Sequence, residues 1–318
     1  MSADEAHAGG DPERTSRPSV SVVVPTRDRP ELLARSLRAI LDQRYAGAIE
    51  VLVIFDQSEA RPIEIDALDG RRIRSLPNGR APGLAGARNT GILEAENELV
   101  AFCDDDDVWL PDKLEAQVER FLERPEATAA TTGIVVEFKG RSFRRIAPTE
   151  LVTFEMLLRS RLMELHPSTF LAWRQDLIDN DGLVDEAIPG AYGEDYEWLL
   201  RRARRGPVLA VRRPLVRVHW GGSSWFAGRW DVVSEALSYL LERYPEFSSD
   251  RRGVARLRGQ LAFAHAAARR PAEARRWAWG ALRANPLERR AFAALAVSTG
   301  LISGQRMLHI ANRLGRGI

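Results

Sequence analysis

The first half of the chain alternates short apolar runs with segments of helical periodicity. Residues 19–24, SVSVVV, and residues 50–55, EVLVIF, are rich in β-branched residues and are expected to be buried strands, the first ended by Pro25. A helix is expected to start near Pro30, because proline and Glu31 suit a first helical turn. Its apolar stripe consists of Leu33, Leu37, Ile40 and Leu41. This strand–helix–strand order predicts an α/β fold with a parallel strand pair and a right-handed crossover.

The pattern continues with further strands and helices. A glycine-rich loop, residues 77–91, leads into an expected helix from about Ala85 to Glu96. The apolar run from Leu99 to Cys103 predicts a third strand. Other expected elements are a helix at 112–123, a strand at 128–138, a helix at 194–205 and an apolar run at 214–218.

The rear of the chain has helical periodicity throughout. Helices are expected at 231–243, 251–268, 271–284, 287–299 and 303–315, with Pro and Gly at the breaks. Residues 261–286 fit half of a tetratricopeptide-like pattern, and because arrays of this kind need about three repeats, the segment should pack on the front domain, a second subunit or a partner. The predicted organisation is a disordered lead at 1–18, a front domain at 19–230 and a helical domain at 231–318.

Charge divides the chain in the same way. Residues 231–318 carry 15 arginines and 7 carboxylates, a net charge of +8, while residues 1–230 have a net charge of −6. The single cysteine, Cys103, excludes an intramolecular disulfide and suits a reducing compartment as a buried core thiol. No apolar run approaches the roughly 20 residues that span a bilayer. We therefore expect a cytoplasmic protein, with peripheral contact at the inner face of the membrane through the basic rear segment as a further expectation.

Four consecutive carboxylates, Asp104 to Asp107, follow the third strand directly. Like charges this close do not all stay ionised in a partly dry site without a cation. Hard divalent cations such as Mg²⁺ or Mn²⁺ take carboxylate oxygens and leave positions for substrate phosphates. The run therefore predicts a metal and phosphate site at the carboxyl end of a strand. A solvated acidic loop is the alternative.

The glycine-rich loop is a second candidate for binding phosphate. A loop of this kind that opens onto a helix presents backbone N–H groups and a positive dipole, and Arg88 adds a fixed charge. The loop matches neither the dinucleotide fingerprint nor the P-loop. A plain surface loop before a helix is the alternative.

Taken together, these segments resemble the family 2 glycosyltransferases. SVVVPTRDRPELLARSL, a strand that ends in an aspartate, GARNTGI and AFCDDDDVWLPDKLE follow in the family's order. The match continues through HPSTFLAWRQDL, GLVDEAIPGAYGEDYEWLLR and PLVRVHWGGSS, and so covers roughly residues 19–225. The resemblance implies the nucleotide-diphosphosugar transferase (GT-A) fold, a Rossmann-like mixed sheet flanked by helices, here followed by a helical, tetratricopeptide-like appendage.

The resemblance implies roles for the four consecutive carboxylates Asp104 to Asp107, which we call the acid run. The family's D-x-D motif falls on Asp104, Asp105 and Asp106, so Asp106 is implied to coordinate Mn²⁺ or Mg²⁺, while Asp104 and Asp105 serve the metal and the donor ribose. Asp107 is expected to be a spare that hydrogen-bonds the turn. His219 stands where many relatives supply a late histidine to the metal or diphosphate; a hydrogen-bonded structural histidine is the alternative.

The pair Glu194-Asp195 matches the family's E-D motif at the start of a helix. Asp195 is implied to be the general base of an inverting reaction, which takes the proton from an acceptor hydroxyl while the nucleotide diphosphate leaves from the opposite face. Contacts to the nucleotide are implied for five further positions: Pro25, Thr26, Asp28, Asp56 and Arg88. Many relatives carry an acidic pair after the second strand, whereas this chain has Phe55-Asp56-Gln57, which leaves the base open.

Other candidates are less specific. His166 is interpreted as an acceptor-side or structural residue. Aromatic residues follow His219 closely and would either stack on sugar faces or seal the seam to the rear helices: Trp220, Trp225, Phe226 and Trp230.

The leading interpretation is a metal-dependent, inverting glycosyltransferase that uses a nucleotide-diphosphate sugar, expected to be UDP-linked. The acceptor is expected to be a glycan, a peptide or a small molecule, and we expect no nucleic-acid partner. A homodimer through the helical segment is a further expectation. The alternatives are a sugar nucleotidyltransferase, which the sequence PTRDRP after the first strand disfavours, and a non-catalytic scaffold.

Overall fold

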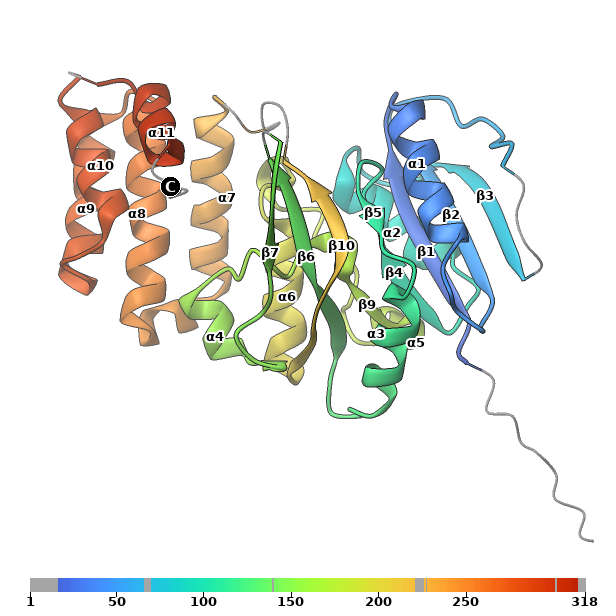
Figure 1. Cartoon of the computed structure of the whole chain (residues 1–318). Helices are drawn as coiled ribbons and strands as arrows, with labels where there is room; N and C mark the ends of the chain where they lie inside the picture. Colours follow the sequence, from blue (N-terminus) through green and yellow to red (C-terminus); the bar gives the residue numbers. More distant parts are fainter. Residues whose placement is uncertain are drawn as a thin grey trace, which may run out of the picture.

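A ten-stranded mixed sheet forms the centre of the molecule, and a stack of helices follows it (Figure 1). The computed structural model describes residues 17–65, 70–138, 140–220, 226, 228–300 and 302–313. The strands are β1 (Val20–Thr26), β2 (Ile49–Phe55), β3 (Arg71–Pro77), β4 (Leu99–Phe102), β5 (Val108–Trp109), β6 (Ala129–Phe138), β7 (Arg141–Arg145), β8 (Leu151–Val152), β9 (Leu171–Trp173) and β10 (Val208–His219). They lie in the order β3-β2-β1-β4-β9-β6-β10-β5, with β7 beside β6 and β8 beside β10.

The first half of the sheet is parallel, as the apolar pattern predicts. β1 pairs with both β2 and β4, and β2 pairs with β3, all in parallel. Helix α1 (Pro30–Leu41) connects β1 to β2 and buries the predicted stripe, and α2 (Leu84–Glu94) connects β3 to β4. Because parallel strands end at one edge, the residues after β1 and β4 meet there. The acid run and Thr26 are therefore neighbours.

The second half of the sheet joins the first through an antiparallel strand. β9 lies between β4 and β6 and is antiparallel to both, while β10 runs parallel to β6. The helical segments of this half are α3 (Lys113–Leu122), α4 (Phe154–Arg159), η1 (Pro167–Thr169), α5 (Arg174–Asp179), η2 (Pro189–Ala191) and α6 (Glu194–Arg205). The expected mixed sheet flanked by helices is confirmed.

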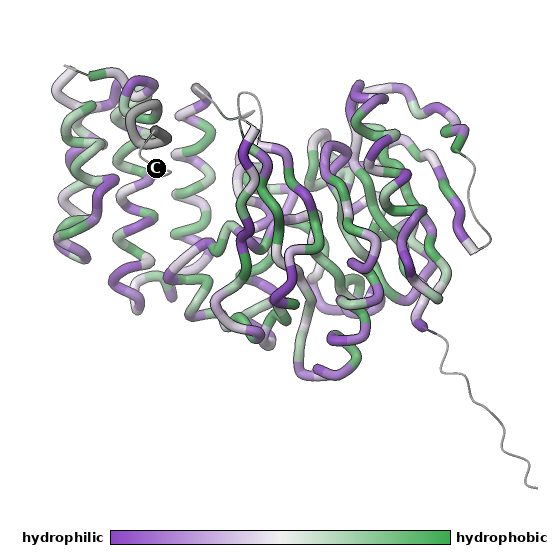
Figure 2. The backbone as a smooth tube through the Cα atoms, in the orientation of Figure 1, coloured by the Kyte–Doolittle hydropathy of each residue, from purple (hydrophilic) through white to green (hydrophobic). Residues whose placement is uncertain are grey.

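Five helices and a short 3₁₀ segment make up the rear of the described chain. They are α7 (Trp230–Arg243), η3 (Pro245–Ser249), α8 (Arg251–Ala267), α9 (Pro271–Ala284), α10 (Arg289–Ser298) and α11 (Gly304–Arg313). Apolar residues of α7 and α8, among them Leu237 and Leu257, share one core with Trp198 of α6, and a smaller alanine-rich core joins α8, α9 and α10. Of the three packing partners expected for the rear segment, the structure shows the front domain of the same chain. Figure 2 shows apolar segments along the central strands and mixed colouring along these helices.

Two details differ from the sequence prediction. β1 does not stop at Pro25 but continues to Thr26, because β4 pairs with β1 only as far as Val23, so no neighbouring strand needs the N–H that proline lacks. β3 is not recognisable from apolar alternation, because it is an edge strand whose Arg72 and Arg74 pair with Glu50 of β2. The prediction that Cys103 is buried is confirmed.

Membrane contact was expected only at the surface. Among the described helices, none combines the length and the apolar character that crossing a bilayer requires. The predicted lead at 1–18 lies outside the described residues except for Arg17 and Pro18.

Candidate active site

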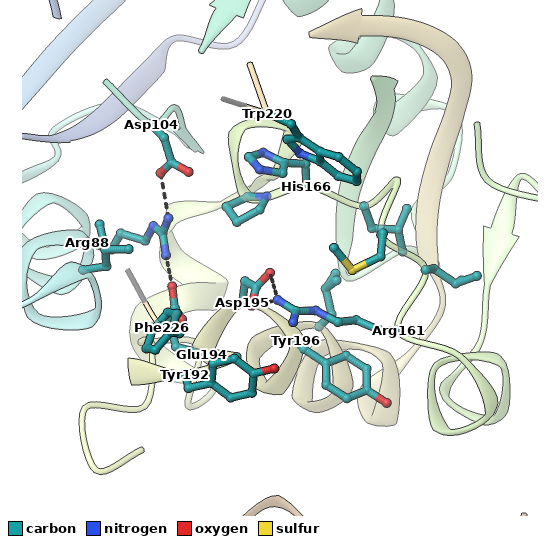
Figure 3. Close-up of a pocket in the computed structure, with 17 residues that line it drawn as sticks. Arg88, Asp104, Arg161, His166, Tyr192, Glu194, Asp195, Tyr196, Trp220 and Phe226 are labelled. Carbon is teal, nitrogen blue, oxygen red and sulfur yellow. Dashed lines mark hydrogen bonds and ion pairs between the residues drawn. The ribbon is translucent and has the colours of Figure 1, made fainter. Parts of the chain in front are cut away.

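A cavity of about 380 Å³ lies at the carboxyl edge of β4, between the acid run, α2 and the start of α6 (Figure 3). Its polar lining comes from segments far apart in the sequence: Arg88, Asp104, Arg161, His166, Glu194 and Asp195. The rest is largely apolar and includes Leu84, Leu162, Met163, Tyr192, Trp220 and Phe226. The cavity thus combines paired charges with an apolar wall, which is the usual composition of a small-molecule site.

Arg88 of α2 connects two carboxylates across the cavity. Its Nη1 donates to Glu194 at 2.6 Å and its Nη2 donates to Asp104 at 2.8 Å, and the side chain is only 2% exposed. α2 lies close enough to β1 for this because Gly91 faces Val23, where a Cβ would come within 2.2 Å of a valine methyl. Burial alone would lower the pKa of Arg88, but Asp104 and Glu194 raise it, so the cation is permanent. We call Asp104, Arg88 and Glu194 the Arg88 bridge.

The four carboxylates of the acid run have unequal surroundings. Asp105 is buried and accepts from Thr26 Oγ1 at 2.7 Å, and Asp106 is 38% exposed and accepts from Arg29 at 2.8 Å. Asp107 is buried and accepts from the Ser168 hydroxyl, which in turn accepts from the backbone N–H of Asp104. Burial raises the pKa of Asp105 to about 6 and that of Asp107 to about 7. The acid run is therefore an ordered turn and not a solvated loop.

Three side chains in the described part of the chain are arranged so that they could hold a cation. Ligand atoms of Asp104, Asp107 and His166 lie within 4.8 Å of one another. Carboxylate oxygens and an imidazole nitrogen suit Mn²⁺, and carboxylates suit Mg²⁺. The donor chemistry therefore fits the cation that the sequence predicts.

This group shares only Asp104 with the predicted metal ligands. Asp106 is paired with Arg29, and His219 is exposed at the end of β10 and is not among the cavity residues. The assignments of Asp106 and His219 therefore stay predictions. The sequence analysis treated Asp107 as a spare and gave His166 no metal role. The one sequence signal for this ligand group was the histidine of HPST, directly before η1.

Glu194 and Asp195 are adjacent but differ in their partners. They open α6 after Gly193, whose φ of 82° is a left-handed conformation that favours glycine. Burial raises the pKa of Glu194 more than Arg88 lowers it. Burial also acts to raise the pKa of Asp195, but Arg161, with smaller contributions from Arg88 and the backbone N–H of Tyr196, lowers it overall. We call Arg161 and Asp195 the Arg161 pair; one nitrogen, Nη2, donates to both carboxylate oxygens, at 2.7 and 2.8 Å.

The predicted donor-side residues lie along the edge formed by β1 and β2. Thr26 holds Asp105, while Asp28 is exposed with a φ of 51°. Asp56 accepts from the Asn78 side chain and from the backbone N–H of Gly83, so it orders the glycine-rich loop. Burial acts to raise the pKa of Asp56, but these hydrogen bonds lower it, and the pKa lies below its ordinary value. The nucleotide roles of Pro25, Thr26, Asp28, Asp56 and Arg88 stay predictions.

The aromatic cluster after His219 divides between the two expected roles. Trp220 and Phe226 line the cavity, and Phe226 packs edge-on against Tyr192 with ring centroids 4.9 Å apart. Trp230 packs against Phe263 of α8 and so belongs to the seam with the rear helices. Trp225 lies outside the described residues.

Residues 21–178 match the model of a known family, described as glycosyl transferase family 2. The glucosyltransferase WfgD of Escherichia coli is 33% identical over 104 residues, which cover 33% of this chain and 41% of WfgD. The succinoglycan biosynthesis protein ExoO of Rhizobium meliloti is 32% identical over 209 residues, which cover 61% of this chain and 58% of ExoO. The chain thus spans about half the length of these two relatives.

Solved structures of low sequence identity share the fold over nearly the whole chain. TarS of S. aureus in complex with UDP-GlcNAc has a TM-score of 0.56 at 17% identity, and 94% of this chain and 92% of that chain are covered. The mannosyltransferase PcManGT of Pyrobaculum calidifontis, in complex with GDP-Man and Mn²⁺, has a TM-score of 0.52 at 19% identity, with 95% and 81% covered. The coverage extends into the rear helices.

Proposed function

Because the chain belongs to glycosyl transferase family 2, we propose that it transfers a sugar from a nucleotide-diphosphate donor to an acceptor hydroxyl. One observation carries the proposal. A single cavity brings the Arg88 bridge, which holds the first carboxylate of the acid run, to the carboxylate pair that opens α6 (Figure 3). The carboxylate proposed for the metal and phosphate end of the donor site and the proposed base therefore line the same cavity.

Asp195 is the proposed general base. It lines the cavity, and Arg161 keeps it ionised, so it can accept the proton of an acceptor hydroxyl as that oxygen attacks the anomeric carbon. The bond from the anomeric carbon to the nucleotide diphosphate breaks at the same time, and the configuration at that carbon is inverted. Glu194 contributes differently, since its contact with Arg88 fixes the start of α6 relative to the acid run.

The donor is proposed to lie with its diphosphate beside Asp104. Mn²⁺ or Mg²⁺, when bound, would neutralise the charge that develops on the leaving diphosphate. Asp104 belongs to both candidate sets of metal ligands. The set predicted from sequence adds Asp106 and His219, and the set that lies together in the fold adds Asp107 and His166. Asp105, held by Thr26, is proposed to contact the donor ribose.

The names of the relatives support a role in polysaccharide assembly, so a glycan is the proposed acceptor and a peptide or small molecule the alternative. UDP is the proposed nucleotide. TarS, which binds UDP-GlcNAc, supports UDP, whereas PcManGT binds GDP-Man. A homodimer and peripheral membrane contact stay predictions.

The proposal is tested with a panel of nucleotide sugars in the presence of Mn²⁺, Mg²⁺ or EDTA. Thermal shift and slow donor hydrolysis are expected to identify one preferred donor whose binding needs the cation. Mn²⁺ titration of Asp104→Asn, Asp106→Asn, Asp107→Asn and His166→Gln then separates the two ligand sets. A panel in which no nucleotide sugar binds would overturn the proposal.

A further inference from the structure

Arg161 uses only part of its hydrogen-bonding capacity. A guanidinium group carries five N–H donors. Both bonds to Asp195 come from the same nitrogen, Nη2, and no other described residue accepts from Nη1 or Nε. The side chain is 30% exposed and lines the cavity. Three donors of a permanent cation are thus left without a described acceptor, on a side chain that lines the cavity.

Among the described residues, the other anion that acts on Arg161 is Glu194, which is already paired with Arg88. The next two residues, Leu162 and Met163, are apolar and line the same cavity. Leu162 has a φ of 48°, which is uncommon for a bulky residue and marks backbone strain beside Arg161. Strain of this kind persists only where neighbouring structure requires it, and here it occurs in the segment that delivers Arg161 to Asp195.

The Arg161 pair also has a chemical cost. A guanidinium group so close to a carboxylate lowers the pKa of Asp195, and a weaker base removes a proton less readily. The other charges near Asp195 are Glu194, its neighbour on α6, and Arg88 of α2, which is already shared between two carboxylates. A negative group that bound the free side of Arg161 would offset its field and restore the basicity of Asp195.

We infer that Arg161 binds an anionic group, a phosphate ester or a carboxylate, that the acceptor carries near its reacting hydroxyl. This inference rests on the proposed function, since Asp195 is the residue that the acceptor must reach. The donor diphosphate is the other source of the same chemistry. We assign the group to the acceptor because Arg161 is bound to the proposed base and not to the acid run.

The test compares two probes that differ by one phosphate group, glycerol 1-phosphate and glycerol. Each is titrated into the full chain by calorimetry, with and without UDP, in a buffer free of phosphate. The phosphate ester is expected to bind at least about 10-fold more tightly than glycerol, because charge-assisted bonds to arginine are the strong ones. Arg161→Gln should remove that preference.

A matched control and a second variant keep the result interpretable. Arg159→Gln removes the same charge two residues away, where the arginine is 61% exposed and pairs with Asp250, and it should bind the ester normally. Asp195→Asn removes the internal competitor for Arg161, so it should bind the ester about 3- to 10-fold more tightly. The two cavity variants thus move in opposite directions.

Four outcomes would overturn the inference. The first is unchanged ester binding in Arg161→Gln, and the second is weaker ester binding in Asp195→Asn. The third is an Arg161→Gln protein that loses about 10-fold in affinity for UDP but not for the ester, which would assign Arg161 to the donor. The fourth is a chain that binds donor normally but shows no ester preference, which refutes only this inference, whereas absence of donor binding refutes the proposed function.

Discussion

The Arg88 bridge and the Arg161 pair are both arginine–carboxylate contacts in one cavity, but they are built for different purposes. Arg88 is almost fully buried and divides its two terminal nitrogens between Asp104 and Glu194. Arg161 is partly exposed and gives one nitrogen to one carboxylate. The first contact engages both terminal nitrogens of Arg88 and fixes the positions of two elements, while the second leaves donors for a ligand.

The difference shows how far burial decides the role of a charge. Removal of one member of a buried arginine–carboxylate contact leaves a buried charge without its partner, so substitutions in the Arg88 bridge should be strongly destabilising. A partly exposed arginine can exchange a protein partner for a ligand with little desolvation. The proposed chemistry therefore depends on the Arg161 pair, and the geometry that supports it depends on the Arg88 bridge.

The largest expected effect is on transfer by Asp195→Asn. Loss of a general base reduces the rate by about 10²- to 10⁴-fold, while donor affinity should stay within about twofold. Initial rates and nucleotide titration measure the two quantities. Asp181→Asn, which changes an exposed carboxylate, is the control. Near-normal transfer by Asp195→Asn would place the base elsewhere.

Removal of Arg88 should affect stability more than removal of any surface arginine. Arg88→Met leaves two carboxylates without their cation in a buried site, which should reduce the free energy of unfolding by about 3–5 kcal/mol. Arg120→Met removes an exposed arginine that pairs with Glu123 and Glu150, and it should reduce the free energy of unfolding far less. Urea unfolding compares the two variants. Equal losses would show that the Arg88 bridge is no stronger than a surface pair.

The Arg161 pair predicts a specific dependence on pH. The lowered pKa of Asp195 means that its ionised form stabilises the fold above its ordinary value of about 3.8, and this contribution is lost as pH falls through the lowered pKa. Transfer should accordingly persist to lower pH than an unshifted carboxylate would allow. In Arg161→Gln the acid limb of the rate profile should move to higher pH. An acid limb at the same pH in Arg161→Gln and in the Arg159→Gln control would contradict this.

The smallest expected effect concerns Lys113, a buried cation without a carboxylate partner in the described part of the chain. Its Nζ lies 3.6 Å from the centre of the Trp109 ring and has no hydrogen-bond partner among the described residues, and burial lowers its pKa to about 7. Since the folded pKa lies below the unfolded one, stability should rise with pH from about 7 to about 10. Lys113→Met should raise Tm at pH 7 by a few degrees and flatten this dependence. A lower Tm would show that the contact with Trp109 outweighs the cost of burial.

The sequence predicted most of the fold because its signals are local. The bounds of α6, and those of α7 to α9 within about a residue, follow from apolar periodicity and from Pro and Gly at the breaks. β3 and β5 escaped prediction because an arginine-rich edge strand and a two-residue strand carry no apolar alternation. Their place depends on neighbours elsewhere in the chain.

The sequence by itself determined the acid run, the Glu194-Asp195 pair and the family, because each is a contiguous motif. Only the tertiary structure decided which charges meet. Arg161 reaches Asp195 across 34 residues, Arg29 reaches Asp106 across 77, and His166 joins Asp104 and Asp107. The physical reason is that a charged side chain meets its partner only where the end of its strand, or the first turn of its helix, lies at the same edge of the sheet as that partner. That arrangement depends on the packing of the whole core and not on local sequence.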